Sequence, residues 1–396
     1  MEHISVKQAS EKWGISVRRV QALCEQGRIP GATRFASLWL IPKASQKPLA
    51  PCQSKNMQRV AQLEEVLHLL SVIAAPMPND NPDAVLNAIC GERARRQFEA
   101  TLSYLRGDFA HVISCFNNAK NDDILKGCLF PFAIAAAASL GKYDMCSEIE
   151  AHYEARIMLG TDDVLSRMEA LSLSSVAISA YAPNMIPDWI KAGDFSFLPP
   201  SLLTNAFQNR ARYLLYTGKP DAALAVAETA LVLCPANNGI TFHAIYLRLI
   251  CATACYIMNL TEACEAHLTE TMHICLPHGF ITPLAEMLID YGGLMEKCLQ
   301  RFYPNSHDAV LSQWEKTIKN WIGFHNRFTK ETLTSLLTKR EIYIAQLAAR
   351  RVSYAKIAEQ QGISITSVKK NMQNIYAKLF ITSRAELEKF VLPIKP

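Results

Sequence analysis

The sequence predicts a mainly all-α protein in which two basic ends flank a long helical middle. Apolar residues recur with the helical period through most of residues 57–330, and no run there clearly alternates with the period of a strand. Half of the 396 residues are apolar, which is enough for several packed domains. The predicted parts are residues 1–46, a Pro-rich linker at 47–56, the helical middle at 57–330 and a last domain at 334–396.

Charge divides the chain in the same way. Residues 1–50 hold 8 Lys and Arg against 3 acids, and residues 334–396 hold 11 against 4. The middle must then carry a balance of −7, because the whole chain is +5. Basic ends favour contact with a polyanion, and the release of its counterions makes such binding strongly salt-dependent. We therefore expect the acidic middle to stay off a nucleic acid.

The first 46 residues predict two short helices followed by a hairpin. Ser5 and Gln8 form a capping-box pattern, Gly14 turns the chain, and Ser16 starts the second helix. Alternation over residues 34–42 predicts the hairpin. The polar residues expected on the outside of this part are Arg18, Arg19, Gln21, Arg34 and Lys43.

This pattern resembles the small winged helix-turn-helix of MerR and excisionase proteins. The resemblance implies that Arg18, Arg19 and Gln21 read or flank bases. It also implies that Arg34 and Lys43 contact phosphate from the wing. Some excisionase-like modules dock a protein instead, and that alternative stays open here.

Residues 334–396 predict four helices with well-marked starts. Thr338 and Glu341 form a capping box, and Ser353 and Ser364 start the next two helices. Gly362 suits the tight turn between these, because glycine adopts a positive φ at the lowest cost. The apolar face of the helix after Ser364 consists of Val368, Met372, Ile375 and Leu379. The polar residues left on its other face are Thr366, Ser367, Lys369, Lys370, Gln373 and Asn374.

The order of these motifs is similar to that of the LuxR-type four-helix DNA-binding domain. The hallmarks lie in order over about 60 residues. They are Leu337-Thr338, Arg340-Glu341, Ile357-Ala358-Glu359, Ile363-Ser364, Ser367-Val368-Lys369, Ile375-Tyr376-Ala377-Lys378-Leu379 and Ser383-Arg384. The alternative is a helical bundle whose basic face is merely solvated.

The LuxR-type resemblance implies a role for each of these polar positions. The helix that begins at Ser364 would enter the major groove, with Lys369, Lys370 and Gln373 nearest the bases and with Thr366 and Ser367 at its start. Lys378 and Arg384 would face phosphates. The last helix would pair two copies on DNA through Leu387, Phe390 and Val391.

Helical hairpins recur in the middle. Gly107, Gly141, Gly218 and Asn259 each stand between an aromatic-containing helix and another helix. Gly107 and Gly141 are 34 residues apart, which is the tetratricopeptide period. The middle thus resembles a tetratricopeptide-like solenoid of roughly four to six hairpins, whose concave surface receives a peptide or a partner protein. A generic helical bundle is the alternative.

No catalytic or cofactor motif stands out. The nucleotide pattern Gly-x-x-x-x-Gly-Lys-Ser/Thr is absent. Cys251 and Cys255 lack the Cys-x-x-Cys spacing of a zinc knuckle, and the scattered cysteines suit reduced thiols in a core. The acidic pairs at 122–123 and 162–163 suit helix starts. The sequence therefore predicts no enzyme, no cofactor and no metal.

Together these patterns predict a cytoplasmic, sequence-specific regulator of transcription. It would bind double-stranded DNA as a homodimer, and its helical middle would sense a signal or bind a protein or peptide partner. The longest apolar stretch, residues 129–140, is too short to cross a membrane. The alternative is a non-catalytic helical scaffold whose basic ends bind protein partners.

Overall fold

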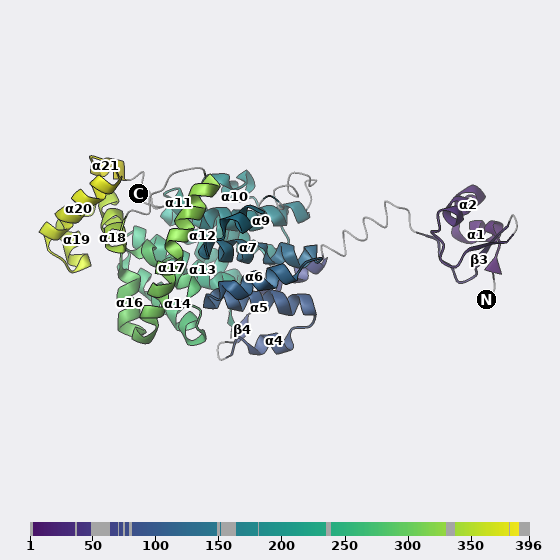
Figure 1. Cartoon of the computed structure of the whole chain (residues 1–396), viewed down its shortest axis with the longest axis horizontal. Coiled ribbons are helices and arrows are strands. Elements are labelled where there is room, and N and C mark those ends of the chain that lie inside the picture. Colours follow the sequence, from purple (N-terminus) through teal and green to yellow (C-terminus); the bar gives the residue numbers. More distant parts are fainter. Residues whose placement is uncertain are drawn as a thin grey trace. The chain divides into compact units, whose positions relative to one another are not determined.

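The chain divides into two compact units, Met1–Glu64 and Glu65–Pro396. The computed structural model describes residues 3–35, 38–48, 64–69, 71–73, 76–78, 81–148, 151, 164–180, 182–234, 239–329, 337–379 and 381–387. Most of the labelled helices in Figure 1 belong to the second unit.

The first unit packs two helices on a small antiparallel sheet. Its core is apolar and includes Ala9, Val20, Leu23 and Ile41. The sheet has the strand order β1-β3-β2, and β2 pairs with β3 as the hairpin that the alternation predicts. The elements are β1 (His3–Ile4), α1 (Val6–Trp13), α2 (Val17–Glu25), β2 (Thr33–Phe35) and β3 (Leu38–Pro42).

Local side-chain bonds start both helices of this unit as predicted. Ser5 and Gln8 form the complete capping box of α1. Ser16 Oγ accepts a hydrogen bond from the backbone N–H of Arg19 at the start of α2. Gly14 ends α1 with φ +63°, a left-handed conformation that favours glycine. The winged helix-turn-helix identity of the unit stays a prediction.

The second unit begins with a body of packed helices. Its first half contains α4 (Ala84–Ala88), α5 (Glu92–Arg106), α6 (Phe109–Asn118), α7 (Asp123–Ser139), α9 (Val164–Ser179), η1 (Pro183–Met185), α10 (Asp188–Ala192) and α11 (Pro200–Tyr216). Its second half contains α12 (Pro220–Leu233), α13 (Phe242–Ile257), α14 (Thr261–Cys275), η2 (Leu276–His278), α15 (Thr282–Glu286), η3 (Leu288–Tyr291), α16 (Leu294–Phe302) and α17 (Pro304–Thr329). Among the described residues, no helix is long and apolar enough to cross a membrane.

Helical hairpins form at the predicted turns. α5 packs against α6, α11 against α12, and α13 against α14, and α12 also packs against α13, so that two hairpins stack. The connecting residues Gly107, Gly218 and Asn259 have φ values of +82°, +75° and +61°. The left-handed turn predicted at Asn259 is therefore confirmed. Whether these hairpins belong to the tetratricopeptide family stays a prediction.

The long helix α17 joins the first hairpins of the body to its last helices. It packs against α7, α15 and α16. Trp321 Nε1 donates to Ser139 Oγ at 2.9 Å, and Tyr143 OH donates to the backbone oxygen of Asn320 at 2.9 Å. A short sheet of β4 (Met77–Pro78) and β5 (Gly239–Ile240) was not predicted. Strands of two residues are too short to show alternation.

Four further helices close the second unit: α18 (Lys339–Ala349), α19 (Tyr354–Gln361), α20 (Ile365–Leu379) and α21 (Arg384–Leu387). They share an apolar core of their own, which includes Ile344, Ile357, Val368 and Ile375. Figure 1 shows them grouped beside α16. The capping box of Thr338 and Glu341 and the caps at Ser353 and Ser364 are confirmed. Phe390 and Val391 lie outside the described residues.

Candidate nucleic-acid interface

Helix α20 has one buried apolar face and one exposed polar face. The buried face consists of Val368, Met372, Ile375 and Leu379, as the sequence predicts. α20 packs against α18 and α19 through this face. The exposed side chains on the other face are Thr366, Lys369, Lys370, Gln373 and Asn374. A helix fixed in this way presents its polar face to the outside without a change in its packing.

The start of α20 is held by the residues of its own first turn. Ser364 Oγ accepts from the backbone N–H of Ser367 at 3.1 Å, and the two hydroxyls lie 2.9 Å apart. Asn371 Nδ2 donates to the backbone oxygen of Ser367 at 2.8 Å. Gly362 makes the preceding turn with φ +62°. Ser367 is thus half-buried and bonded at the helix start, whereas Thr366 beside it is exposed.

Lys378, at the other end of α20, has a partner inside the domain. Its Nζ donates to Glu341 Oε2 at 2.7 Å. Glu341 is buried and also accepts from the backbone N–H of Thr338 at 2.7 Å. Burial raises the pKa of Glu341, but the hydrogen bonds from Lys378 and Thr338 outweigh burial and hold that pKa below its usual value. Lys378 therefore ties the end of α20 to the start of α18.

Arg384 is also bonded within the domain. Its Nε donates to the backbone oxygen of Ala348 at 2.5 Å, and its second terminal nitrogen donates to that of Val352 at 2.7 Å. The guanidinium carbon lies 5.8 Å from the centre of the Tyr354 ring. Arg384 thus adds a side-chain donor to carbonyls at the end of α18, where that of Ala348 also accepts from the backbone N–H of Arg351 at 2.8 Å. The phosphate contacts expected of Lys378 and Arg384 stay predictions.

Comparison with known families identifies this part of the chain. Residues 335–391 match the luxR family of bacterial regulatory proteins. The matching family model is GerE, and the match spans α18 to α21. The LuxR-type resemblance of the C-terminal part is confirmed. No curated protein and no solved structure matches the chain.

We expect acid to destabilise the LuxR-family domain through Glu341. Its pKa is lower in the folded state than the unfolded value of about 4.3, so its contribution to stability is present above about pH 4.3 and is lost as the pH falls through the folded pKa. Glu341→Gln should unfold at a lower temperature at neutral pH and lose part of the acid dependence. Thermal unfolding followed by circular dichroism tests this. Glu359→Gln, an exposed change on α19, is the control, and parallel acid curves for Glu341→Gln and the wild type would rule Glu341 out.

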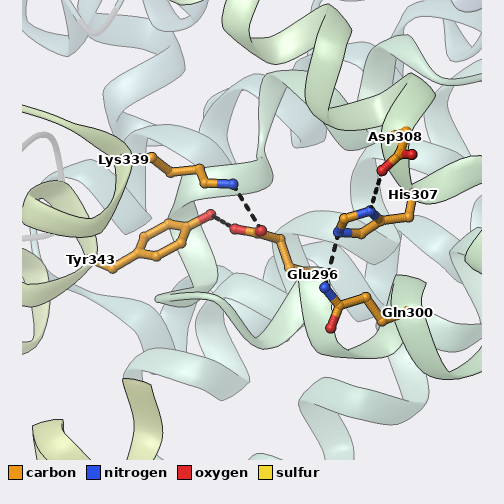
Figure 2. A network of polar contacts seen from close by, with 6 residues as sticks. All are labelled: Glu296, Gln300, His307, Asp308, Lys339 and Tyr343. Carbon is orange, nitrogen blue, oxygen red and sulfur yellow. Dashed lines mark hydrogen bonds and ion pairs between the residues drawn. The ribbon is translucent and has the colours of Figure 1, made fainter. Parts of the chain in front are cut away.

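The LuxR-family domain docks on the helical body through α18. Figure 2 shows Glu296 of α16 accepting from two residues of α18, Lys339 and Tyr343. The distance from Lys339 Nζ to Glu296 Oε2 is 2.9 Å. Tyr343 is buried, and its ring packs into the core of the body. The same figure also draws Gln300, His307 and Asp308. Gln300 Nε2 lies 3.3 Å from His307 Nε2, and His307 Nδ1 lies 2.8 Å from Asp308 Oδ1.

A second group of contacts joins the end of α18 to the end of α13. A terminal nitrogen of Arg350 donates to the backbone oxygens of Tyr256 and Ile257 at 2.7 and 3.1 Å. The Arg350 guanidinium carbon lies 4.3 Å from the centre of the Tyr256 ring, close enough for a cation–π interaction. Both carbonyls belong to the last turn of α13, and that of Tyr256 also accepts from the backbone N–H of Asn259 at 3.1 Å. No local sequence pattern singles out Arg350, because its partners lie far away in the sequence.

The turn before α16 completes the docking surface. Gln361 Nε2 donates to the backbone oxygen of Gly292 at 2.8 Å, and Lys297 Nζ donates to that of Gln360 at 2.7 Å. Gly292 has φ +54°, and a Cβ there would lie 2.2 Å from Tyr256 Oη, so this position requires glycine. The body thus contacts α18 and the end of α19. The polar face of α20 stays exposed.

The first unit presents its predicted site residues on its surface. Arg18, Arg19 and Gln21 are exposed along α2. Arg34 is exposed on β2, and its guanidinium carbon lies 6.0 Å from the centre of the Trp39 ring. Lys43 is also exposed, and its backbone oxygen accepts a hydrogen bond from Lys12 Nζ at 2.7 Å. Whether this unit binds DNA or protein stays a prediction.

The cysteines of the body lie in its core. Cys251 and Cys255 are both buried, and burial raises the pKa of Cys251 to about 12. A thiol with such a pKa stays protonated at neutral pH, whereas thiolate is the form that binds metals and reacts. Within the described part of the chain, no three His, Cys, Asp or Glu residues are placed to hold a metal ion.

Proposed function

We propose that this protein regulates transcription by reading double-stranded DNA with α20. The supporting observation is that Lys369, Lys370 and Gln373 lie on the exposed face of a helix whose other face is fixed in the core of a LuxR-family domain. The major groove of DNA admits an α-helix, and Lys and Gln recognise the edges of guanine and adenine there. Thr366 lies near the N-terminus of α20, where it would contact the sugar-phosphate backbone of the DNA.

The two cations at the edges of the domain have a different role in this proposal. Lys378 and Arg384 hold α20 and α21 against α18 through their bonds to Glu341, Ala348 and Val352. These bonds fix the position of α20. A fixed position matters for DNA binding, since a misplaced helix cannot make bidentate contacts with bases. Any contact with phosphate is secondary to this structural role.

The first unit would supply a second contact to DNA, through Arg18, Arg19 and Gln21. Two modules joined by a tether bind one DNA molecule more tightly than either does alone, by roughly 10²–10⁴-fold when the spacing permits. A LuxR-family domain that reads DNA as a homodimer would double these contacts. Leu387 is buried in the core of its own domain, so it would hold the last helix in place and would not form the subunit surface. Such a regulator would act in the cytoplasm. It would need no enzymatic activity and no cofactor.

Selection from random DNA duplexes tests the proposed function. The full-length chain is incubated with the pool, and bound duplexes are amplified and sequenced over several rounds. We expect one shared motif with two half-sites, and we expect it to persist when residues 1–46 are deleted. A scaffold that binds acidic protein partners would enrich no motif. That result would refute the proposal.

We propose that the contacts between the helical body and α18 couple the conformation of the body to DNA binding by α20. Glu296 and Gly292 of the body contact Tyr343 and Gln361 of the LuxR-family domain, so a shift of this turn would move α18. A ligand changes such a system only through different affinities for two states. The body would therefore sense a signal or a partner, and α18 would respond.

Arg350→Ala should uncouple the LuxR-family domain from the body. The change removes donors to the carbonyls of Tyr256 and Ile257 as well as the ring contact, at a cost of about 1.5–3 kcal/mol. Scanning calorimetry of the variant should show an earlier transition for the domain, separate from that of the body. Arg340→Ala, an exposed change on the same helix, is the matched control. A variant that unfolds as the wild type does would exclude this contact as the coupling point.

A further inference from the structure

A cavity lies inside the helical body, away from the DNA-reading face. Its volume is about 100 Å³, and its walls come chiefly from α5, α7, α9, α11 and α13. A second cavity of about 40 Å³ lies against α17 and is lined by Trp314 and Trp321. Both cavities are lined by Ser179, Arg212 and Glu286, so they share a wall. From this shared wall we infer one candidate site with two lobes.

One wall of the larger lobe is polar, although it faces the interior. Ser201, Asn205, Asn209 and Arg212 follow one another at helical spacing along α11 and line the cavity. The last two are only 1% and 8% exposed. The inward face of a packed helix is ordinarily apolar, since buried polar groups are costly without partners. The facing residues of α9 are also polar, namely Ser172, Ser175 and Ser179.

The shared wall carries one positive and one negative side chain. Arg212 donates to Tyr216 Oη at 2.9 Å and to Ser179 Oγ at 3.3 Å. Glu286 accepts from Tyr246 OH at 2.8 Å and also from Tyr104 OH. Burial raises the pKa of Glu286 above its usual value, and the two phenol donors and the nearby Arg212 oppose that rise. These bonds hold an opposite pair of charges in fixed positions beside the cavity.

The other titratable groups that line the larger lobe are neutral. Burial lowers the pKa of His243 to about 4, and its Nδ1 lies 2.8 Å from Gln208 Oε1. Burial also raises the pKa of the thiol of Cys128 to about 12. Two apolar rings, those of Phe132 and Phe242, also line this lobe. The charge of an occupant would therefore be matched by Arg212 and Glu286.

The smaller lobe contains a buried donor that lacks an acceptor. Trp314 is 6% exposed, and its Nε1 has no hydrogen-bond partner among the described residues. A buried donor left unpaired lowers stability, so an acceptor atom in this lobe would be favourable. A carboxylate has enough lone pairs to accept from Arg212 and Trp314 together.

Size restricts the class of ligand. A dry cavity of about 150 Å³ in another protein holds one benzene molecule, and the two lobes together approach that volume. They therefore accommodate on the order of six to eight non-hydrogen atoms. These volumes favour a free amino acid with a short side chain over a hexose or a peptide.

We propose that this site binds a small free α-amino acid, with its carboxylate on Arg212 and its ammonium group on Glu286. Its side chain would lie against the polar wall of α9 and α11. This inference rests on the proposed sensing role of the helical body, and it names the chemical class of the signal. α15 ends at Glu286, six residues before Gly292 of the docking surface, so occupancy would act on the turn that contacts α18.

The test uses the full-length chain and known compounds. Each standard amino acid is added at millimolar concentration, and the melting temperature is measured. Calorimetric titration of the active compounds then gives affinity and stoichiometry. We expect at least one small amino acid to bind with a stoichiometry of one. The amine without the carboxylate and the acid without the amino group should bind about 10- to 100-fold more weakly, since each lacks a charge-assisted bond. Equal binding of either analogue, or of glycerol instead, would overturn the proposal.

Variants separate the site from general stability. Arg212→Gln and Glu286→Gln should abolish the shift in melting temperature. Arg210→Gln on the same helix should keep it, because Arg210 donates to the backbone of Ile190, outside the cavity. If the charge variants do not fold, Ala135→Leu replaces them in the test. Ala135 lines the larger lobe, so the larger side chain should fill that lobe and abolish binding. Unchanged binding by Ala135→Leu, or no binding by any amino acid, would refute the site.

The two proposals fail separately. If DNA selection yields a motif while no amino acid binds, the ligand site is wrong and the DNA-reading function stands. If an amino acid binds while no motif appears, the DNA-reading function is wrong and the ligand site stands.

Discussion

A chain that carries Lys369→Ala together with Lys370→Ala should bind its selected duplex at least about 30-fold more weakly than the wild type. Each lysine is exposed on α20, and loss of one base contact costs about 1–3 kcal/mol. The lower bounds of the two changes add to about 2 kcal/mol, which corresponds to about 30-fold in affinity. The fold should not change, because neither side chain contributes to the core of the domain.

Gel-shift titration with the selected duplex and with a scrambled duplex measures this effect. Lys316→Ala with Lys319→Ala is the matched control, because it removes the same charge from exposed positions on α17. The control should bind the selected duplex as the wild type does. If the α20 variant keeps its preference for the selected duplex over the scrambled one, α20 does not read the bases.

Arg384→Ala should destabilise the LuxR-family domain by about 1.5–3 kcal/mol, because charge-assisted bonds to two carbonyls are lost. The ring contact with Tyr354 is lost as well. The carbonyls of Ala348 and Val352 would lose this donor, although that of Ala348 keeps the backbone N–H of Arg351. Thermal unfolding should show an earlier transition of this domain, and DNA binding should fall at temperatures where that transition begins.

A contact with phosphate would give a different result for the same variant. Loss of one phosphate contact lowers the dependence of log K on log salt by about 1 and leaves the domain stable. Titrations over a range of salt concentrations, at a temperature well below the transition, therefore distinguish the two roles. An unchanged melting temperature with a reduced salt slope would show that Arg384 faces phosphate.

Local features of this fold were predictable from the sequence. Thr338 with Glu341 starts α18, and Gly362 ends α19, because each depends on neighbours within a few residues. The apolar spacing of α20 likewise fixes which of its side chains face outward. The same reasoning predicted the left-handed Asn259, since the turn follows a helix end.

Contacts between distant residues were not predictable in this way. Lys378 and Glu341 are 37 positions apart in the sequence, and no local pattern predicts the hydrogen bond between them. The family resemblance assigned Lys378 to phosphate, whereas the structure shows it bonded within the domain. Docking of Arg350 on Tyr256 depends on how α13 ends against α18.

One sequence pattern is associated with the cavity. The polar residues Ser201, Asn205, Asn209 and Arg212 recur at helical spacing beside the apolar residues of α11, and a buried polar stripe is unusual. Periodicity alone does not show which stripe faces inward. Glu286 reaches the same site only through the stacking of the hairpins, so its pairing with Arg212 required the structure.

Genome-wide binding in cells tests the central claim most directly. Chromatin immunoprecipitation and sequencing of the full-length chain should give sites that share one motif, the motif found by selection in solution. The Lys369→Ala, Lys370→Ala chain, expressed at the same level, should lose these sites. Sites that persist in the double variant, or sites without a shared motif, would contradict DNA reading by α20.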